Sequence, residues 1–248
     1  MSRRAFALAL LAVLPLNAQD DALVAAPSNY KLVYENGYVR VIRSQAKPGE
    51  RSPLHQHGEL PLLEVILSDG PSALLLADGR RIERRTKTGD ISYNPGASGP
   101  HQIENPGTSY SMAIRIELKA KAGSKQPPLP ARDAPKVDPK HYTVELDNEH
   151  FRVLRAAYAA GERSPMHQHP ARPFVMIFLG DQKWSWQSGS AQPAQRSFTH
   201  GDFLYQGGGQ THALHNNGSS RAEFLVVELK GAVAAAAPAK RRPTPPVK

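Results

Sequence analysis

The chain has 248 residues, a formal net charge of +9 and no cysteine. Hydrophobic residues make up 40% of it and aromatic residues 7%, which is enough apolar material for one large or two small packed domains. The lack of cysteine excludes disulfides, thiolate metal ligands, a cysteine nucleophile and a lipid-modified N-terminal cysteine.

The N-terminal segment has the pattern of a secretory signal peptide. Arg3 and Arg4 precede an apolar run at residues 5–16, and small residues including Ala18 follow. The run is too short to span a bilayer, and Pro15 disfavours the alternative of a core helix. We therefore expect residues 1–18 to be cleaved on export, which makes the mature protein periplasmic or secreted. No other stretch is apolar enough for a membrane span.

The next region, residues 28–119, consists of short apolar runs separated by turns. The runs lie at 38–43, 62–67, 73–76 and 113–118, and Asp69-Gly70 and Asp78-Gly79 are typical turn pairs. Short runs of this kind favour β-strands, and no long helical period competes with them. Many short strands broken by turns predict an all-β sandwich or barrel.

Two histidines end the sequence Gly-Glu-Arg-Ser-Pro-Leu-His-Gln-His at residues 49–57. In a strand, residues i and i+2 point to the same face, so His55 and His57 aim both imidazoles at one place. The best candidate for a third ligand is His101, which follows a glycine-containing turn. Neutral imidazoles suit a divalent transition metal, and iron, manganese, nickel, copper and zinc all remain open.

Residues 120–139 are rich in proline and lack periodicity, which predicts a semi-extended linker. After it, residues 140–230 repeat the first region. The sequence at 161–169 differs from that at 49–57 only by Met166 in place of Leu54, at an offset of 112 residues. A repeat of this length is domain-sized. It predicts a second metal site with the ligands His167, His169 and His212.

Four aromatic residues recur at positions that suit packing. Tyr93 and Tyr205 are partners in the repeat, and a role in packing the barrel wall is favoured over lining a pocket. Trp184 and Trp186 share a strand face and are expected to pack or to form a dimer surface.

The last segment, residues 231–248, is rich in alanine and proline and predicts a disordered basic tail. It contains four lysines and arginines and no acidic residue. Much of the positive charge therefore belongs to the tail and the linker and forms no groove-lining patch. We expect no nucleic-acid partner.

The two histidine sets resemble the motifs of the cupin superfamily. The first motif is Gly, five residues and His-x-His; the second is Gly, five residues, Pro-x-Gly, two residues, His, three residues and Asn. The second half matches the latter with Gly201, His212 and Asn216, and only Gly207 replaces the usual proline. The first half has a turn that is one residue longer before His101. The resemblance implies a bicupin, with tandem double-stranded β-helix (jelly-roll) barrels at 28–119 and 140–230 that pack on each other as a pseudo-dimer.

The resemblance departs from the family at the glutamate ligand. The expected positions hold Pro61 or Leu62 in the first half and Pro173 or Phe174 in the second, and none of these side chains binds a metal. The resemblance therefore implies three-histidine sites. Glu59 and Glu64 are the candidates for an additional acid in the first half; their repeat partners are Ala171 and Met176.

Two functions follow from such sites. The first is a metal-dependent enzyme, with dioxygenase-like or other small-molecule chemistry at the open metal positions. The second is a non-catalytic protein that holds metal or a small ligand for binding or scaffolding. A catalytic barrel should have a pocket beside the histidines that an acid or a tyrosine faces, whereas a scaffold should be plugged by Leu, Phe or Trp. We expect a small-molecule ligand or substrate and leave a homo-oligomer open.

Overall fold

A computed structural model describes residues 21–120 and 126–231 of the chain. The predicted signal peptide, part of the predicted linker and all but the first residue of the predicted tail lie outside these residues. Over the described residues no helix has the length and apolar character needed to cross a membrane.

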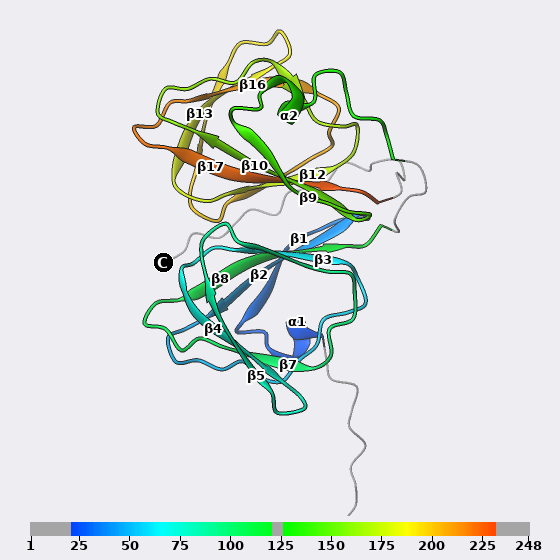
Figure 1. Cartoon of the computed structure of the whole chain (residues 1–248), viewed down its shortest axis with the longest axis vertical. Helices are drawn as coiled ribbons and strands as arrows, with labels where there is room; N and C mark the ends of the chain where they lie inside the picture. The colour runs from blue at the N-terminus through cyan, green and yellow to red at the C-terminus, as the bar shows by residue number, and fades with distance from the viewer. Residues whose placement is uncertain (1–20, 121–125, 232–248) are drawn as a thin grey trace, which may run out of the picture.

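The described chain forms two β-barrels, one above the other in Figure 1. Barrel 1 (residues 21–120) contains α1 (Ala22–Ala25), β1 (Tyr30–Glu35), β2 (Val39–Ala46), β3 (Leu62–Ile66), β4 (Gly70–Leu76), β5 (Arg81–Thr86), β6 (Ile91–Asn94), β7 (His101–Glu104) and β8 (Ser111–Leu118). Barrel 2 (residues 133–231) contains α2 (Ala134–Val137), β9 (Tyr142–Asp147), β10 (Phe151–Tyr158), β11 (His167–Gln168), β12 (Phe174–Phe178), β13 (Gln182–Ser188), β14 (Ala194–Phe198), β15 (Phe203–Gln206), β16 (Thr211–Asn216) and β17 (Ala222–Leu229).

Each barrel has a large and a small antiparallel sheet. In barrel 1 the strand orders are β1-β2-β8-β3-β6 and β5-β4-β7, and in barrel 2 they are β9-β10-β17-β12-β15 and β11-β16-β13-β14. This confirms the all-β, two-barrel prediction. Each apolar run proposed from the sequence lies in or overlaps a strand. The hairpin strand β5 was not predicted, because its exposed residues Arg-Ile-Glu-Arg-Arg-Thr show no apolar face.

The two large sheets pack against each other and form a shared apolar core between the barrels. Val41 and Ile116 from barrel 1 and Val153 and Val227 from barrel 2 are fully buried there. These sheets are therefore covered on both faces, and the middle of β17, Phe-Leu-Val-Val, is accordingly apolar on both faces.

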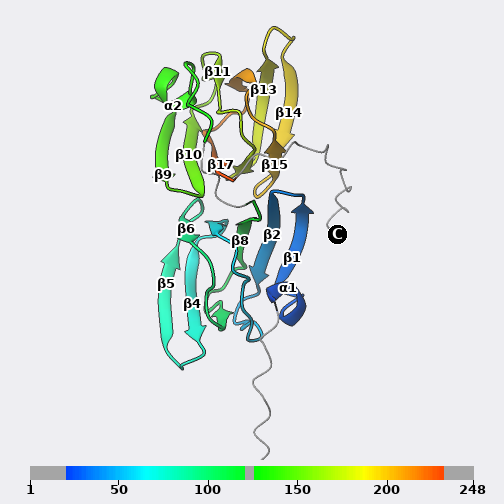
Figure 2. The same cartoon turned by 90° about the vertical axis from the view of Figure 1, so that its right-hand side faces the viewer.

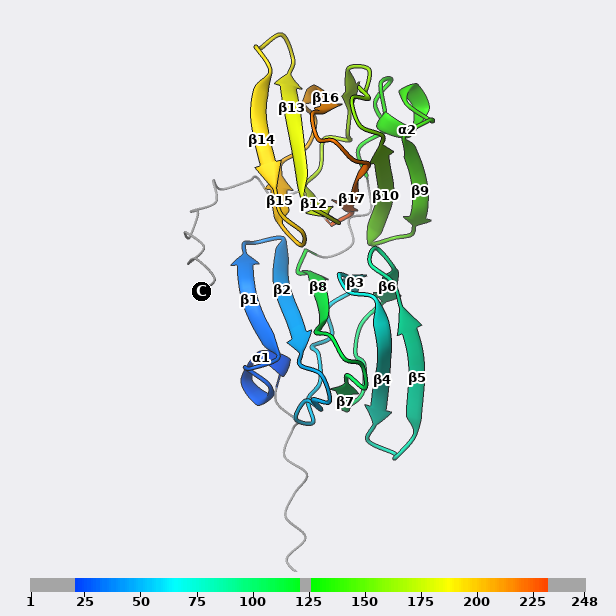
Figure 3. The same cartoon turned by 90° about the vertical axis from the view of Figure 1, so that its left-hand side faces the viewer.

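The packing follows an approximate two-fold relation. Arg43 donates to the carbonyl of Gly201 at 2.8 Å, and its repeat partner Arg155 donates to the carbonyl of Gly89 at 2.6 Å. In Figures 2 and 3, β1 and β2 lie on the same side of the molecule as β13 and β14, while β9 and β10 lie on the side of β4 and β5. Reciprocal contacts of this kind define an isologous interface, so the halves pack as the expected pseudo-dimer.

The repeat extends further toward the N-terminus than the motifs indicated. Asp133 forms an ion pair with Arg152 at 2.7 Å, and Ala134 is buried in the barrel 2 core. In barrel 1, Asp21 pairs with Arg40 at 3.4 Å in the same way. Residues on the N-terminal side of the predicted bounds, from Asp21 in barrel 1 and from Asp133 in barrel 2, therefore belong to the two barrels, and the end of the predicted linker packs on barrel 2. The motif comparison did not reach these segments, although Asp21-Ala22, Pro27 and Tyr30 recur at the same offset as Asp133-Ala134, Pro139 and Tyr142.

Candidate metal centres

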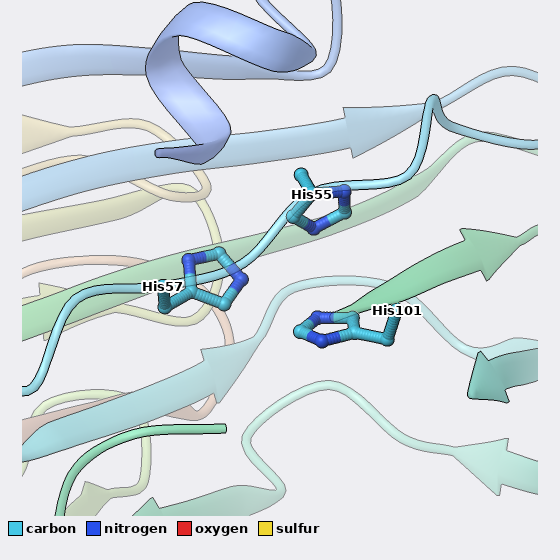
Figure 4. A group of neighbouring side chains, drawn as sticks. All are labelled: His55, His57 and His101. Carbon is cyan, nitrogen blue, oxygen red and sulfur yellow. The ribbon is translucent and has the colours of Figure 1, made fainter. Parts of the chain in front are cut away.

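The six histidines singled out in the sequence come together as two groups of three, one inside each barrel. Within each group the ligand atoms all lie within 4.8 Å of one another, and every residue is buried. The groups are His55, His57 and His101 in barrel 1 and His167, His169 and His212 in barrel 2. Figure 4 shows the three imidazoles of barrel 1 facing one another.

Strand pairing brings each third histidine to its partners. The His55 and His101 backbones exchange two hydrogen bonds, of 3.0 Å and 2.9 Å. In barrel 2 the equivalent pair, His167 on β11 and His212 on β16, is directly opposed in the sheet. Residues opposite each other in an antiparallel pair have neighbouring side chains, so the two motifs must meet once these strands pair.

Glycines hold the loop with the histidine pair against the turn before the third histidine. Gly208 has a φ of +79°, and a Cβ there would lie 2.0 Å from the carbonyl oxygen of Arg172. In barrel 1, a Cβ on Gly96 would lie 2.7 Å from the carbonyl oxygen of Glu59. Only glycine permits this close approach together with a positive φ. The turn that precedes the third histidine therefore packs directly against the loop that follows the histidine pair, and this contact holds the two motifs together.

Carbonyl groups orient the imidazoles so that Nε2 faces inward. The Nδ1 atoms of three histidines lie 2.8–3.0 Å from backbone carbonyl oxygens: His55 from Pro53, His101 from Gly99 and His167 from Pro165. A carbonyl oxygen only accepts, so Nδ1 carries the proton and Nε2 keeps its lone pair. The tautomer suited to metal binding is therefore set by the fold.

The same imidazoles are held neutral. Burial lowers the pKa of His55 to about 4 and that of His167 to about 3, and it also lowers the pKa of His57, His101 and His212. The Nε2 atoms of His55, His57, His169 and His212 are buried without a hydrogen-bond partner. Buried polar atoms rarely remain unpaired. Neutral, converging and unpartnered imidazoles suit a divalent transition metal.

Neither candidate for an additional acidic ligand belongs to the histidine groups. Glu59 is exposed. Glu64 lines the lumen of barrel 1, where its carboxylate accepts a hydrogen bond of 3.1 Å from Arg115. Among the described residues, both groups that could hold a metal consist of histidine alone.

Sequence reasoning missed a buried carboxylate behind the histidines of barrel 2. Glu228 is fully buried, with Oε1 3.3 Å from His169 Nδ1 and Oε2 2.7 Å from an Arg172 nitrogen. Burial acts to raise its pKa, but His169, Arg172 and Arg152 outweigh this and lower it. The repeated Glu-Leu-Lys ending of each half was the available signal, because it contains Glu228.

The barrel 1 partner of this carboxylate is Glu117, which lies 3.3 Å from Arg40. Leu60 stands where barrel 2 has Arg172, so a second guanidinium is lacking there. Burial consequently raises the pKa of Glu117 above its usual value.

Two tyrosines at one repeat position also escaped notice. The Tyr142 hydroxyl lies 3.1 Å from His167 Nε2. The Tyr30 ring lies against His55 and His57, with centroid distances of 4.8 Å and 5.5 Å, and its buried hydroxyl has no partner. Burial raises the pKa of Tyr30 to about 12 and also raises that of Tyr142, so both hydroxyls keep their protons.

The two tyrosines and two tryptophans for which the sequence favours packing are packed in the structure. Tyr93 and Tyr205 are half-buried against the core between the barrels, and Tyr93 bonds to His150 Nδ1 at 2.7 Å. Trp184 and Trp186 are buried in the barrel 2 core.

The two lumens differ sharply. Barrel 1 contains a cavity of about 510 Å³ that His101, Tyr30, Glu64 and Arg115 help to line. At equivalent strand positions, small or polar residues of barrel 1 correspond to large apolar residues of barrel 2: Ala46 to Tyr158, Ser72 to Trp184, Ala113 to Phe224, Glu64 to Met176 and Arg115 to Val226. These larger residues form the barrel 2 core, and Trp186 stacks on His212 with ring centroids 5.0 Å apart.

Comparison with known proteins finds similarity at the level of structure. No family model and no curated protein matches the sequence. AerE from Microcystis aeruginosa matches over 81% of this chain and 97% of its own, at 14% identity and a TM-score of 0.55. An oxalate decarboxylase from Lactobacillus farciminis, solved as a formate complex, matches over 84% and 86%, at 14% identity and a TM-score of 0.53.

A cupin 2 conserved barrel domain protein from Leptotrichia buccalis matches over 81% of this chain and 88% of its own, at 9% identity and a TM-score of 0.50. Identities this low establish the fold and not the reaction. The two sheets of each barrel, the paired histidine motifs and these structural matches agree that the chain has a bicupin fold, with two cupin-like barrels in tandem.

Proposed function

We propose that barrel 1 is a metal-dependent catalytic centre for a small carboxylic acid, with His55, His57 and His101 as the metal ligands. The observation that carries the proposal is a roomy cavity beside these histidines in barrel 1, lined in part by charged side chains, at positions where barrel 2 is filled with larger apolar residues. The tyrosine and the acid expected of a catalytic barrel are Tyr30 and Glu64.

Arg115 indicates the charge of the substrate. This residue is 7% exposed and lines the cavity, and its Nε atom is buried without a hydrogen-bond partner. A buried guanidinium with an unmet donor favours a carboxylate partner, which can accept two parallel hydrogen bonds. Arg84 also lines the cavity and adds positive charge.

The residues around the cavity have distinct roles in this proposal. Arg115 binds and orients the carboxylate of the substrate. Glu64 holds the guanidinium of Arg115 in place and is the cavity carboxylate suited to accept or return a proton. A divalent metal on three imidazoles supplies Lewis-acid character and open coordination positions for the rest of the substrate.

The structural neighbours support this class of chemistry. The similar structures include an oxalate decarboxylase from Bacillus subtilis with Mn(II) centres and the Lactobacillus farciminis enzyme in complex with formate. Manganese is therefore the first metal to test among iron, manganese, nickel, copper and zinc, with decarboxylation and dioxygenase-like oxidation as the reactions to assay.

Metal and ligand binding can be tested together. We expect untagged protein to contain metal, and we expect His55→Ala plus His57→Ala to empty barrel 1 only. Metal-loaded protein should bind small mono- and dicarboxylates in calorimetry. Arg115→Met should weaken this binding about a hundredfold, because the charged partner is lost. Arg221→Met, an exposed arginine of barrel 2, is the matched control. Carboxylate binding that survives Arg115→Met unchanged would contradict the proposal.

We also propose that the protein acts after export. The charged, apolar and small-residue pattern of residues 1–18 supports this. Mass spectrometry of the protein from the periplasm or the medium should find the N-terminus at Gln19. An intact N-terminus on cytoplasmic protein would refute export.

A further inference from the structure

The barrel 2 centre contains a possible oxygen ligand that does not belong to the cupin motifs. The Tyr142 hydroxyl lies 3.1 Å from His167 Nε2, the inward-facing atom of that imidazole. The Tyr142 ring also packs against His167 and His169, with centroid distances of 5.2 Å and 6.1 Å. Tyr142 is 3% exposed, so bulk water does not compete for the hydroxyl.

The separation of these two atoms suits two ligands of one ion. Nitrogen and oxygen ligands lie about 2.1 Å from a metal such as zinc, and at angles of about 90–110° two such ligands are about 3.0–3.4 Å apart. The observed oxygen-to-nitrogen distance of 3.1 Å falls in this range. We propose that Tyr142 is the fourth ligand of barrel 2 and replaces the glutamate that Pro173 and Phe174 cannot provide.

Binding requires the phenol to give up its proton. In the metal-free barrel the hydroxyl donates to the lone pair of His167 Nε2. When a metal binds, that lone pair forms a metal–nitrogen bond, the phenol O–H bond breaks, and the oxygen forms a metal–oxygen bond. The proton leaves to solvent.

The charges near the site favour an anionic ligand. Three neutral imidazoles leave the full charge of a divalent ion in a core of buried aromatic side chains, which is costly. One phenolate halves that charge. Glu228 behind His169 does not supply this compensation, because it is already matched by Arg152 and Arg172.

A site with four protein ligands in a filled lumen has no place for a substrate. Structural zinc sites are closed in this way, whereas catalytic sites keep an open position. The inference therefore assigns barrel 2 a structural metal and extends the proposal for barrel 1 without depending on it. Its metal should stabilise barrel 2, including α2, which is tied to Glu228 through Asp133 and Arg152.

Spectroscopy of the isolated centre tests the inference. The His55→Ala plus His57→Ala protein retains only the barrel 2 site and is loaded with Cu(II) or Fe(III). We expect a visible tyrosinate-to-metal charge-transfer band that Tyr142→Phe abolishes. Tyr142→Phe should also weaken metal binding at least about tenfold in a competition assay with a chelator. The matched control is Tyr205→Phe, a half-buried tyrosine of barrel 2 whose ring packs in the core between the barrels, stacked on Tyr34.

The outcomes are distinct. A band that persists in Tyr205→Phe and disappears in Tyr142→Phe supports the inference. Metal that binds without the band, an affinity unchanged in Tyr142→Phe, or a barrel 2 that takes up no metal each overturns it. None of these results bears on carboxylate binding in barrel 1, so the two proposals fail separately.

Discussion

The two barrels share three histidines at equivalent repeat positions but differ in what surrounds them. Barrel 1 leaves a cavity of about 510 Å³ beside its histidines, while Tyr158, Trp184 and Phe224 fill the same region of barrel 2. A duplicated ligand set therefore does not imply a duplicated function. Barrel 2 matches the cupin turn motif more closely, yet barrel 1 has the pocket, because the motif describes how the histidines are placed and not the lumen around them.

Removing the aromatic filling should destabilise barrel 2 strongly. Trp184→Ala deletes a fully buried indole, and we expect a loss of about 3–5 kcal/mol in the free energy of unfolding. The equivalent change in barrel 1, Ser72→Ala, should stay within about 0.5 kcal/mol because Ser72 lines a cavity. Urea unfolding of both variants measures the difference. Equal losses would break the contrast between a packed and an open lumen.

Filling barrel 1 should convert it toward barrel 2. Ala113→Phe introduces the residue that barrel 2 carries at Phe224, and its ring would occupy the cavity. We expect carboxylate binding to fall about a hundredfold, equivalent to about 2.7 kcal/mol, while the metal content measured by elemental analysis is retained. Unchanged ligand binding would mean that the substrate site lies elsewhere. Thr108→Phe, outside the cavity, is the control for an added ring.

The carboxylate behind His169 should tune metal affinity in barrel 2. Glu228→Gln removes the negative charge beside Nδ1 of His169. Hydrogen-bond partners of ligand histidines commonly contribute about 10–100-fold to metal affinity. Chelator competition on the His55→Ala plus His57→Ala background measures the metal affinity of barrel 2. Glu117→Gln should have a smaller effect in barrel 1, where burial raises the pKa of Glu117 and the second arginine is missing. Equal effects would remove this distinction.

The smallest expected effect is the acid sensitivity of the metal-free protein. The unfolded chain protonates its histidines near pH 6.5, but His55 resists protonation until about pH 4. Between these values the unfolded state binds more protons, so stability falls as pH falls. Thermal unfolding from pH 7 to pH 4 should show this loss, and His55→Asn should flatten the curve. A curve unchanged by His55→Asn would argue against the buried, neutral imidazole.

The sequence by itself determined the duplication, the all-β class and both histidine triads. Local sequence patterns are enough for these conclusions. His-x-His predicts two imidazoles that point the same way, and the number of residues from this pair to His101 or His212 resembles that of a known motif. The pseudo-dimer also followed from the resemblance, and the reciprocal bonds of Arg43 and Arg155 confirm it.

Only the tertiary structure decided which barrel is open and what lies behind the ligands. Arg115 meets Glu64 across β8 and β3, and Tyr142 reaches His167 from a strand 25 residues earlier. Glu228 meets His169 across 59 residues of chain. Such contacts depend on strand register and on the volume left when two sheets close, and neither can be read from local patterns. The histidines identify where a metal can bind, and the packing around them distinguishes the open lumen of barrel 1 from the filled lumen of barrel 2.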